Sequence, residues 1–369
     1  MAKSSAVEEP TALQTEVLAV DCDAHEYLES LSLLVPHLAR EWRTYIQEWG
    51  ATQMYVGNRY MVKPSPGRLD WRAPGGGPRG ADPALVKRHL FEEQAIGVAI
   101  LNSLEVSPDY ADVLPEFGAA ICAAYSDYQI DHWLSQDSRF RGSVYVSLQD
   151  PILAAKEIDR VAKHPQIVQV ILPLVGNRQY GDPFYRPIYE ATVRNGLAIA
   201  IHHSAQSPTA IGFPRNWIEW HTNFPQAMIS QLTSLLFNGT FDAYPDLKIV
   251  CLEAGFTWLP YWMARMDRQY MEFRHTVPWV KRKPSTYIAK HIRLATQPME
   301  ELSKQQFMTI LDLVGSDEVL VFSTDYPHSD ADQVASVLPA GVPDALRTKV
   351  LRGNALGTYP RLSGLGPIR

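Results

Sequence analysis

Residues Val17–His25 read VLAVDCDAH, and this stretch decides the fold class and the chemistry that the chain supports. An apolar strand runs directly into a carboxylate at Asp21, a second at Asp23 and an imidazole at His25. Because strand side chains alternate between two faces, the three polar side chains are predicted to point the same way at the end of a buried strand. Burying them together is unfavourable without compensation, so the pattern predicts a divalent cation at this place.

Strand-like runs recur along the chain, with helix-like stretches between them. Most runs are short and rich in Val and Ile, as expected of strands that are covered on both faces. Strands are predicted over 16–23, 94–102, 142–149, 167–173, 197–203, 247–254, 291–297 and 318–325. Helices are predicted over 111–136, 151–163, 184–195, 225–237, 257–274, 299–314 and 331–338. Eight βα units predict an α/β protein with a closed (β/α)8 TIM barrel.

The polar residues 1–15 are predicted to be a flexible N-terminus, and 16–369 a single barrel domain. Two inserted loops interrupt the alternation of strands and helices in this domain. One insertion, at about 44–90, is rich in Gly, Pro and Arg, and the other, at about 204–224, is aromatic. Long connections in compact domains often serve as lids or binding loops, so we expect the insertions to cap the site.

The composition of the chain limits the classes of partner and the compartment that we expect for it. The net charge of −6 and the lack of a basic tract argue against nucleic acid as a partner. The three cysteines show no metal-binding spacing, and they fit a reducing compartment. We see no apolar run long enough to span a membrane and no apolar signal core in 1–16. The expectation is a cytoplasmic protein that acts on a small molecule.

Polar residues follow several of the predicted strands. Active sites of (β/α)8 barrels lie at the carboxyl ends of the strands, so these residues are predicted to meet at one mouth. They are Asp23 and His25, Asn102, Gln149 and Asp150, His202 and His203, Glu253, and Asp325 with His328. Mixed imidazole and carboxylate ligands suit Zn, Fe or Mn.

The chain resembles the amidohydrolase-2 family, which includes decarboxylases similar to aminocarboxymuconate semialdehyde decarboxylase and γ-resorcylate decarboxylase. The matching motifs are Asp23-Ala-His25, His202, Ser323-Thr-Asp325-Tyr-Pro-His328, and the stretch FDAYPDLKIV that begins at Phe241. The resemblance covers about 17–359 apart from the insertions. It implies a distorted (β/α)8 barrel, with metal ligation by Asp23, His25, His202 and Asp325.

The sixth strand departs from the family pattern. Most decarboxylases of the family place a His there as acid and base, whereas this chain has Glu253. Glu253 is either a general base beside one metal or a carboxylate that bridges two, which makes it a candidate metal ligand as well. His328 is a candidate for catalysis or for supporting a ligand, and His221 is a further catalytic candidate.

Three functions follow from this inventory. The first is a metal-dependent hydrolase or nonoxidative decarboxylase of a small organic acid or derivative, with Zn or Mn polarising a substrate oxygen or activating water, and Glu253 moving protons. The second is an oxygen-activating monooxygenase component with a dinuclear Fe/Fe or Fe/Mn site and a reductase partner. The third is a catalytically silent subunit. A homo- or hetero-oligomer is expected on family grounds, with the aromatic helix 257–274 as a surface.

Overall fold

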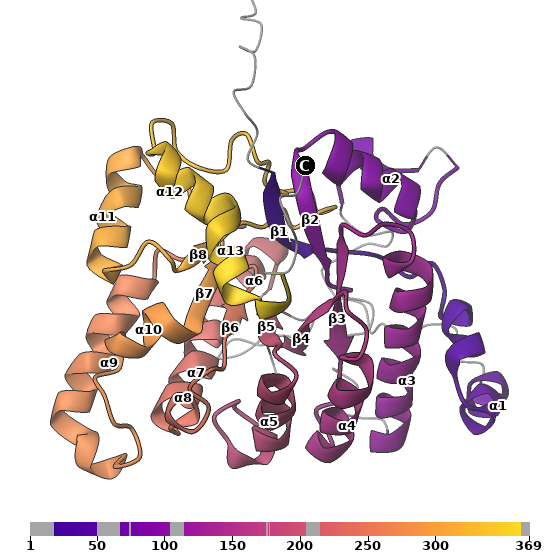
Figure 1. The fold of residues 1–369 in the computed structure, drawn as a ribbon, viewed down its shortest axis with the longest axis horizontal. Helices are drawn as coiled ribbons and strands as arrows, with labels where there is room; N and C mark the ends of the chain where they lie inside the picture. Colours follow the sequence, from indigo (N-terminus) through magenta and orange to yellow (C-terminus); the bar gives the residue numbers. More distant parts are fainter. Residues whose placement is uncertain are drawn as a thin grey trace, which may run out of the picture.

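Eight parallel strands form one sheet in the order β1 to β8, and helices surround it in the computed structural model (Figure 1). The structure describes residues 18–49, 67–73, 75–103, 114–174, 176, 178–203 and 215–362. The strands are β1 (Ala19–Ala24), β2 (Ile96–Leu101), β3 (Phe140–Tyr145), β4 (Ile167–Pro173), β5 (Ala198–His202), β6 (Ile249–Cys251), β7 (Ile292–Ala295) and β8 (Leu320–Val321). Every strand residue is buried, as the apolar runs predict.

The last strand returns to the first and nearly closes the barrel. Cys22 N donates to Phe322 O at 3.0 Å, and His25 N donates to Tyr326 O at 2.7 Å. A parallel bridge between Ala24 and Tyr326 lies in the same seam. The predicted (β/α)8 barrel is therefore confirmed, and the segment after β8 is fixed against the carboxyl end of β1.

Helices follow the strands as the alternation predicts. They are α1 (Arg40–Trp49), α2 (Pro83–Lys87), α3 (Pro115–Tyr128), α4 (Pro151–Val161), α5 (Arg186–Arg194), α6 (Trp217–Thr222), α7 (Phe224–Phe237), α8 (Thr240–Ala243), α9 (Leu259–Phe273), α10 (Ser285–His291), α11 (Lys304–Val314), α12 (Asp344–Thr348) and α13 (Asn354–Thr358). None of the helices in the described ranges is long and apolar enough to cross a bilayer.

Side-chain caps fix where several helices begin. Asp150, which the sequence places at the end of the third strand, instead caps α4 by accepting from Ile152 N and Leu153 N. Ser303 and Gln306 form a reciprocal capping box, so α11 begins four to five residues later than the predicted start at 299.

The helix predicted over 331–338 is wrong. This segment forms turns, and the helix that follows β8 is α12, which begins at Asp344. The amide of Asp332 donates to Thr324 O at 2.9 Å, and the amide of Ser336 donates to Gln333 O at 3.1 Å. The first bond ties the segment to the residues that follow β8, and the second closes a turn within it, so the repeating i to i−4 ladder of a helix does not form.

Alternate strand residues form a small apolar core inside the barrel, separate from the larger core between strands and helices. Val20, Cys22, Val98, Ala200 and Val250 belong to this inner core. A polar column stands beside it, because Gln169 donates to Asn102 Oδ1 at 2.7 Å and accepts from Tyr359 at 2.9 Å. The column links the site end of the barrel to the C-terminal segment.

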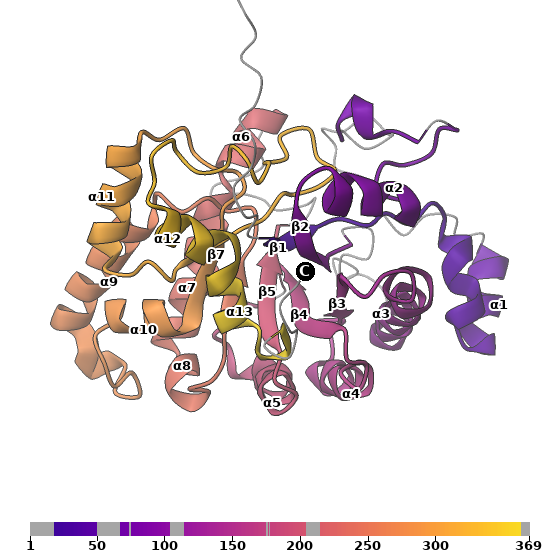
Figure 2. The same cartoon turned by 45° about the horizontal axis from the view of Figure 1, so that its top comes forward.

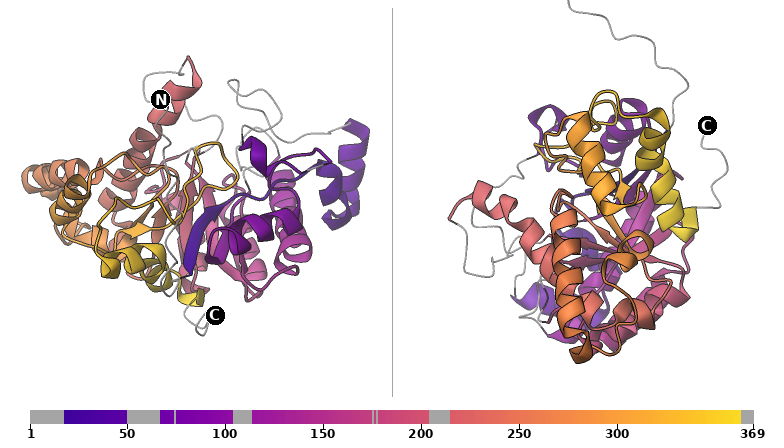
Figure 3. Two further views of the ribbon diagram at one scale, coloured as in Figure 1. Left: turned by 90° about the horizontal axis from the view of Figure 1, so that it is seen from above. Right: turned by 90° about the vertical axis from the view of Figure 1, so that its left-hand side faces the viewer.

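Both predicted insertions are described in part. Residues 50–66 and 204–214 lie outside the described residues. Within the first insertion, Arg68 N donates to Pro327 O at 3.0 Å, so this loop packs onto the segment that follows β8. The second insertion contributes α6, which stands out from the body of the barrel (Figures 2 and 3).

Candidate metal centre

Four side chains from distant parts of the chain converge at the carboxyl end of the barrel. Asp23 lies in β1 and His25 directly follows it, His202 ends β5, and Asp325 comes from the segment after β8. One ligand atom of each lies within 4.8 Å of the others. None of the four is more than 1% exposed, so water does not compensate their charges.

Hydrogen bonds orient both imidazoles of this group. His25 Nδ1 lies 2.6 Å from the carbonyl oxygen of Asn102, and His202 Nδ1 lies 2.8 Å from the carbonyl oxygen of His203. Because a carbonyl only accepts, each Nδ1 carries the proton and donates. The other nitrogen of each ring, Nε2, therefore faces the centre of the group with its lone pair when the ring is neutral.

Two atoms of the group have no hydrogen-bond partner among the described residues: Asp23 Oδ2 and His202 Nε2. They lie 3.5 Å apart. In a tetrahedral site with bonds of about 2.0–2.2 Å, neighbouring ligand atoms are about 3.3–3.6 Å apart. These buried, unpartnered atoms and their spacing fit a divalent cation held by Asp23, His25, His202 and Asp325.

Protons compensate the carboxylates when no cation is bound. Burial lowers the pKa of His25, but Asp23 and Asp325 outweigh burial and raise it to about 10. Burial raises the pKa of Asp23 even though His25 and His202 oppose this. A divalent cation at this place would take over the role of the protons.

Asp325 is held in an unusual backbone conformation. Its φ of 59° lies in the left-handed region, and its amide donates to Asp23 O at 2.9 Å. One oxygen, Oδ1, lies 2.7 Å from His25 Nε2, and the other, Oδ2, lies 2.8 Å from His328 Nδ1. The Nε2 atom of His328 lies 2.9 Å from the hydroxyl of Tyr27. Asp325 thus connects the cation position to His328.

Glu253 is the centre of a second group. Its φ is 50°, and it is only 3% exposed. His202 Nε2 lies 3.3 Å from its Oε2, His221 Nε2 lies 3.0 Å from its Oε1, and His203 Nε2 contacts Oε2. Burial would raise the pKa of Glu253, but the neighbouring histidines hold it well below its usual range. Burial lowers the pKa of His203 to about 4, so this imidazole is neutral near pH 7.

The short helix α6 brings His221 to Glu253. Asn216 caps α6 through a reciprocal capping box with Glu219. The ring of His221 stacks on Trp217 at 5.7 Å between centroids, and His203 stacks on Phe224 at 4.1 Å. The described part of the second insertion therefore lies over the site and supplies an imidazole to it.

The structure brings the predicted site residues together. Asp23, His25, His202 and Asp325 form the first group, and Glu253, His203, His221 and His328 lie against it. Their roles as ligands and catalysts stay predictions.

Asp21 does not face this group, because a register shift follows it in β1 and its carboxylate accepts from Thr324 N and Oγ1 at 2.9 and 2.6 Å. The prediction that all three polar residues of β1 point the same way is wrong for Asp21.

Sequence reasoning assigned no role to two residues that touch this site, Asn102 and Tyr27. Asn102 donates to Asp23 Oδ1 at 2.9 Å, and its position after the second strand was a signal for it. Tyr27 lies two residues beyond the Asp23-Ala-His25 motif, and no pattern in the sequence marks its contact with His328.

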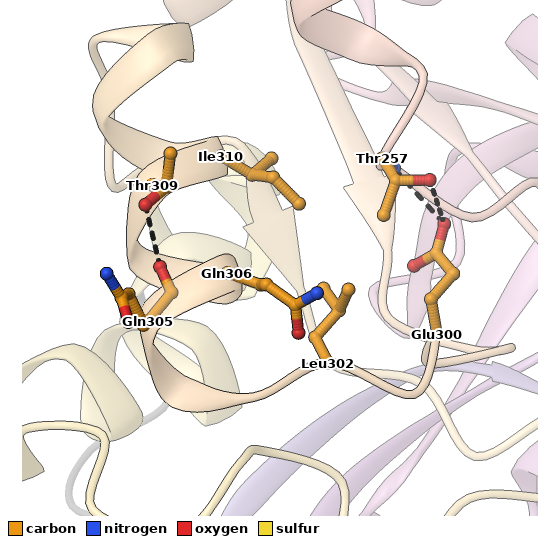
Figure 4. A pocket seen from close by; sticks show the side chains of 7 residues that line it. All are labelled: Thr257, Glu300, Leu302, Gln305, Gln306, Thr309 and Ile310. Carbon is orange, nitrogen blue, oxygen red and sulfur yellow. Dashed lines mark hydrogen bonds between the residues drawn. The ribbon is translucent and has the colours of Figure 1, made fainter.

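A surface hollow of about 560 Å³ lies between the start of α9 and helix α11 (Figure 4). No residue of either group lines it, and its only charged side chain is Glu300. One carboxylate oxygen of Glu300, Oε1, accepts from Phe256 N and Thr257 N at 3.0 and 3.1 Å. Glu300 therefore holds the loop that follows Glu253 in place, and the hollow is not the candidate reaction site. Its lining residues are Thr257, Glu300, Leu302, Gln305, Gln306, Thr309 and Ile310.

A family model described as "Amidohydrolase" matches residues 20–361. This chain belongs to that amidohydrolase family. Membership confirms the family resemblance of the sequence motifs and the expectation of a metal-dependent enzyme on this barrel. The first group of side chains is one of three groups among the described residues whose ligand atoms lie close enough together to hold a metal ion.

Known proteins similar to this amidohydrolase include decarboxylases. A γ-resorcylate decarboxylase of Polaromonas sp. strain JS666 is 28% identical over 246 residues, which cover 63% of this chain and 74% of the relative. The structure of an amidohydrolase from Mycobacterium avium subsp. paratuberculosis K-10 superposes with a TM-score of 0.74 at 18% identity, covering 94% of this chain and 100% of the other. A dihydroxybenzoic acid decarboxylase from Polaromonas sp. JS666, with bound manganese and 2-nitroresorcinol, gives a TM-score of 0.65 at 19% identity, covering 94% and 98%.

Proposed function

We propose that this amidohydrolase is a metal-dependent nonoxidative decarboxylase of a small aromatic or related organic acid that carries an oxygen next to its carboxylate. The observation that carries the proposal is the buried group with two unpartnered atoms, Asp23 Oδ2 and His202 Nε2, in a chain whose relatives include γ-resorcylate decarboxylases. A divalent metal bound there would polarise the oxygens of the substrate.

The chain also offers a proton for the carbon that loses its carboxylate. Decarboxylation breaks a carbon–carbon bond, releases carbon dioxide and leaves a carbon that must accept a proton. Burial lowers the pKa of His328, but the neighbouring carboxylate of Asp325 outweighs burial and raises it, which favours the protonated ring. The ring lies between Asp325 Oδ2 and the hydroxyl of Tyr27, at 2.8 and 2.9 Å, which fixes its orientation. We assign the proton delivery to His328.

The test is release of carbon dioxide under nitrogen, with Mn(II) or Zn(II) and no reductant. Probe acids begin with 2,6-dihydroxybenzoate and 5-carboxyvanillate, after the names of structurally similar decarboxylases. We expect one carbon dioxide for each acid consumed and none with Asp325→Asn, which removes a charge from the cation position. His328→Gln is expected to retain metal and to lower kcat by about 100-fold or more, the usual contribution of a general acid.

The same assay separates the alternatives. A product that gains water without releasing carbon dioxide indicates a hydrolase. Turnover that needs oxygen and a reductase indicates the monooxygenase component. That function stays a prediction, and so does the expected assembly into a homo- or hetero-oligomer. A silent subunit would show no turnover with any probe, and Asp325→Asn would leave the activity of its complex unchanged.

A further inference from the structure

Glu253 has more partners than one proton carrier needs. Imidazole nitrogens of His202, His203 and His221 all meet its carboxylate, within 3.3 Å where the contact is longest. The first cation position is already complete without Glu253, because Asp23, His25, His202 and Asp325 supply four ligands. Glu253, His203 and His221 therefore remain as a second set of three.

This second set is buried and lacks part of its hydrogen bonding. Within the described part of the chain, Glu253 Oε2 meets the Nε2 atoms of His202 and His203 without a hydrogen bond of acceptable geometry to either, and His221 Nε2 meets the other oxygen, Oε1. The side chains of Glu253 and His203 are 2% and 6% exposed, so water does not reach them freely. Unpartnered polar atoms at such depth are unfavourable unless a bound group satisfies them.

Aromatic side chains fix the directions of the two imidazoles. Phe224 stacks on the ring of His203, and Trp220 meets the same ring edge-on at 5.1 Å between centroids. Trp217 stacks on His221. Because the rings are oriented before any ligand arrives, less conformational entropy is lost when they bind one.

Charge balance also favours a second cation. Asp23, Glu253 and Asp325 are three carboxylates in one buried site, and Glu253 and Asp325 offer oxygens within 4.8 Å of each other and of His328. One divalent cation leaves one negative charge on these three carboxylates, which a protonated histidine would otherwise have to balance. A second makes the site positive, which favours an anionic substrate.

We propose that Glu253, His203 and His221 hold a second divalent transition-metal ion, and that Glu253 bridges it to the first. Glu253 Oε2 faces His202, a ligand of the first position, while Oε1 faces His221. Metal ions in two-metal sites lie about 3.5–4 Å apart, a separation that one carboxylate spans. Two imidazoles and one carboxylate select Mn, Fe, Co or Zn over Mg and Ca, and three protein ligands leave a position open for substrate. This inference goes beyond the proposed function and does not depend on it.

The test measures metal stoichiometry rather than turnover. The full-length protein is stripped of metal, titrated anaerobically with Mn(II), desalted and analysed by plasma mass spectrometry, with electron paramagnetic resonance of the bound Mn(II). We expect two equivalents and a spin-coupled signal from the wild type. Glu253→Gln and His221→Gln are each expected to retain one equivalent, lose the coupled signal and weaken the second binding step by at least ten-fold.

His37→Gln is the matched control. The side chains of His37 and His221 are 19% and 20% exposed, and both lie near a carboxylate, but His37 pairs with Asp131 outside the site. The control is expected to bind two equivalents. His221→Gln decides the question if Glu253→Gln does not fold, because His221 lies on the protruding helix α6.

The proposal is overturned if the wild type saturates at one equivalent, or if a folded His221→Gln variant binds two with the coupled signal. These outcomes are separate from failure of the proposed function. Two bound metals without release of carbon dioxide would contradict the decarboxylase and support the second site. One bound metal with release of carbon dioxide would do the reverse.

Discussion

Asn102 holds Asp23 through a hydrogen bond of 2.9 Å from its side-chain Nδ2 to Oδ1. The backbone carbonyl of the same Asn102 lies 2.6 Å from His25 Nδ1. One residue after β2 thus orients two ligands of the first cation position. Groups that hold ligands in place contribute to metal affinity, because they fix the direction of the donor atoms before the metal binds.

Asn102→Ala is therefore expected to weaken metal binding by about 10–100-fold while the four ligands stay in the sequence. The measurement is a competition titration against a chelator of known affinity. Asn195→Ala is the control, because the Asn195 side chain donates to Asp159 and Ala191 O and touches no site residue. Equal metal affinities of the two variants would contradict the orienting role of Asn102.

The left-handed backbone at Asp325 predicts a ranking of two variants. Asn adopts positive φ readily, whereas Ala in this region is unfavourable by about 1–2 kcal/mol. In metal-free protein, Asp325→Asn is expected to be more stable than Asp325→Ala by about 1 kcal/mol, although neither holds metal tightly. Urea unfolding of both variants measures the difference. The same stability for both would mean that the φ of 59° carries no strain.

Much of the first cation position follows from the sequence, since Asp23, His25, His202 and Asp325 stand at strand ends and barrel strands all end at one mouth. Two features had no such basis. The contact of His221 with Glu253 depends on how α6 folds back over the barrel. A loop sequence has no periodic pattern of apolar residues from which the path of the loop could be predicted. The turn of Asp21 away from the site depends on a local register shift that alternation does not predict.

Glu300 is expected to position the loop that carries Glu253. Its Oε1 accepts from Phe256 N, Thr257 N and Thr257 Oγ1, all at 3.0–3.1 Å. Removing the acceptor leaves these donors unpaired, so Glu300→Ala is expected to lower stability by about 1–3 kcal/mol and to weaken the binding of a metal at Glu253. Thermal unfolding and metal titration measure the two effects.

Two further variants make this test specific. Glu301→Ala removes an exposed carboxylate at the neighbouring position and is expected to change neither stability nor metal binding. Glu300→Gln keeps an oxygen acceptor and is expected to restore part of both. If Glu300→Gln were as impaired as Glu300→Ala, the negative charge and not the hydrogen bonding would hold the loop.

His291 gives an acid dependence of stability that is separate from the site. Burial lowers its pKa from 6.5 to about 4, and the nearby Lys290 and Lys248 act in the same direction, while its hydrogen bond to Leu247 O opposes them. The folded protein therefore prefers the neutral ring, whereas the unfolded chain binds a proton below about pH 6.5. The stabilisation is complete above pH 6.5 and is lost as the pH falls toward 4, by about 3 kcal/mol in all.

His291→Asn keeps a donor for Leu247 O and removes the titration. The variant is expected to be less stable than the wild type at pH 7.5, because it loses the stacking of the imidazole on Phe241. Between pH 6.5 and 4.5 its stability should fall less steeply than that of the wild type, since the unfolded variant gains no proton at this position. Urea unfolding at several pH values measures both slopes. Parallel slopes would show that His291 ionises equally in the folded and unfolded chains, and that the ring carries its charge in the interior beside Phe241.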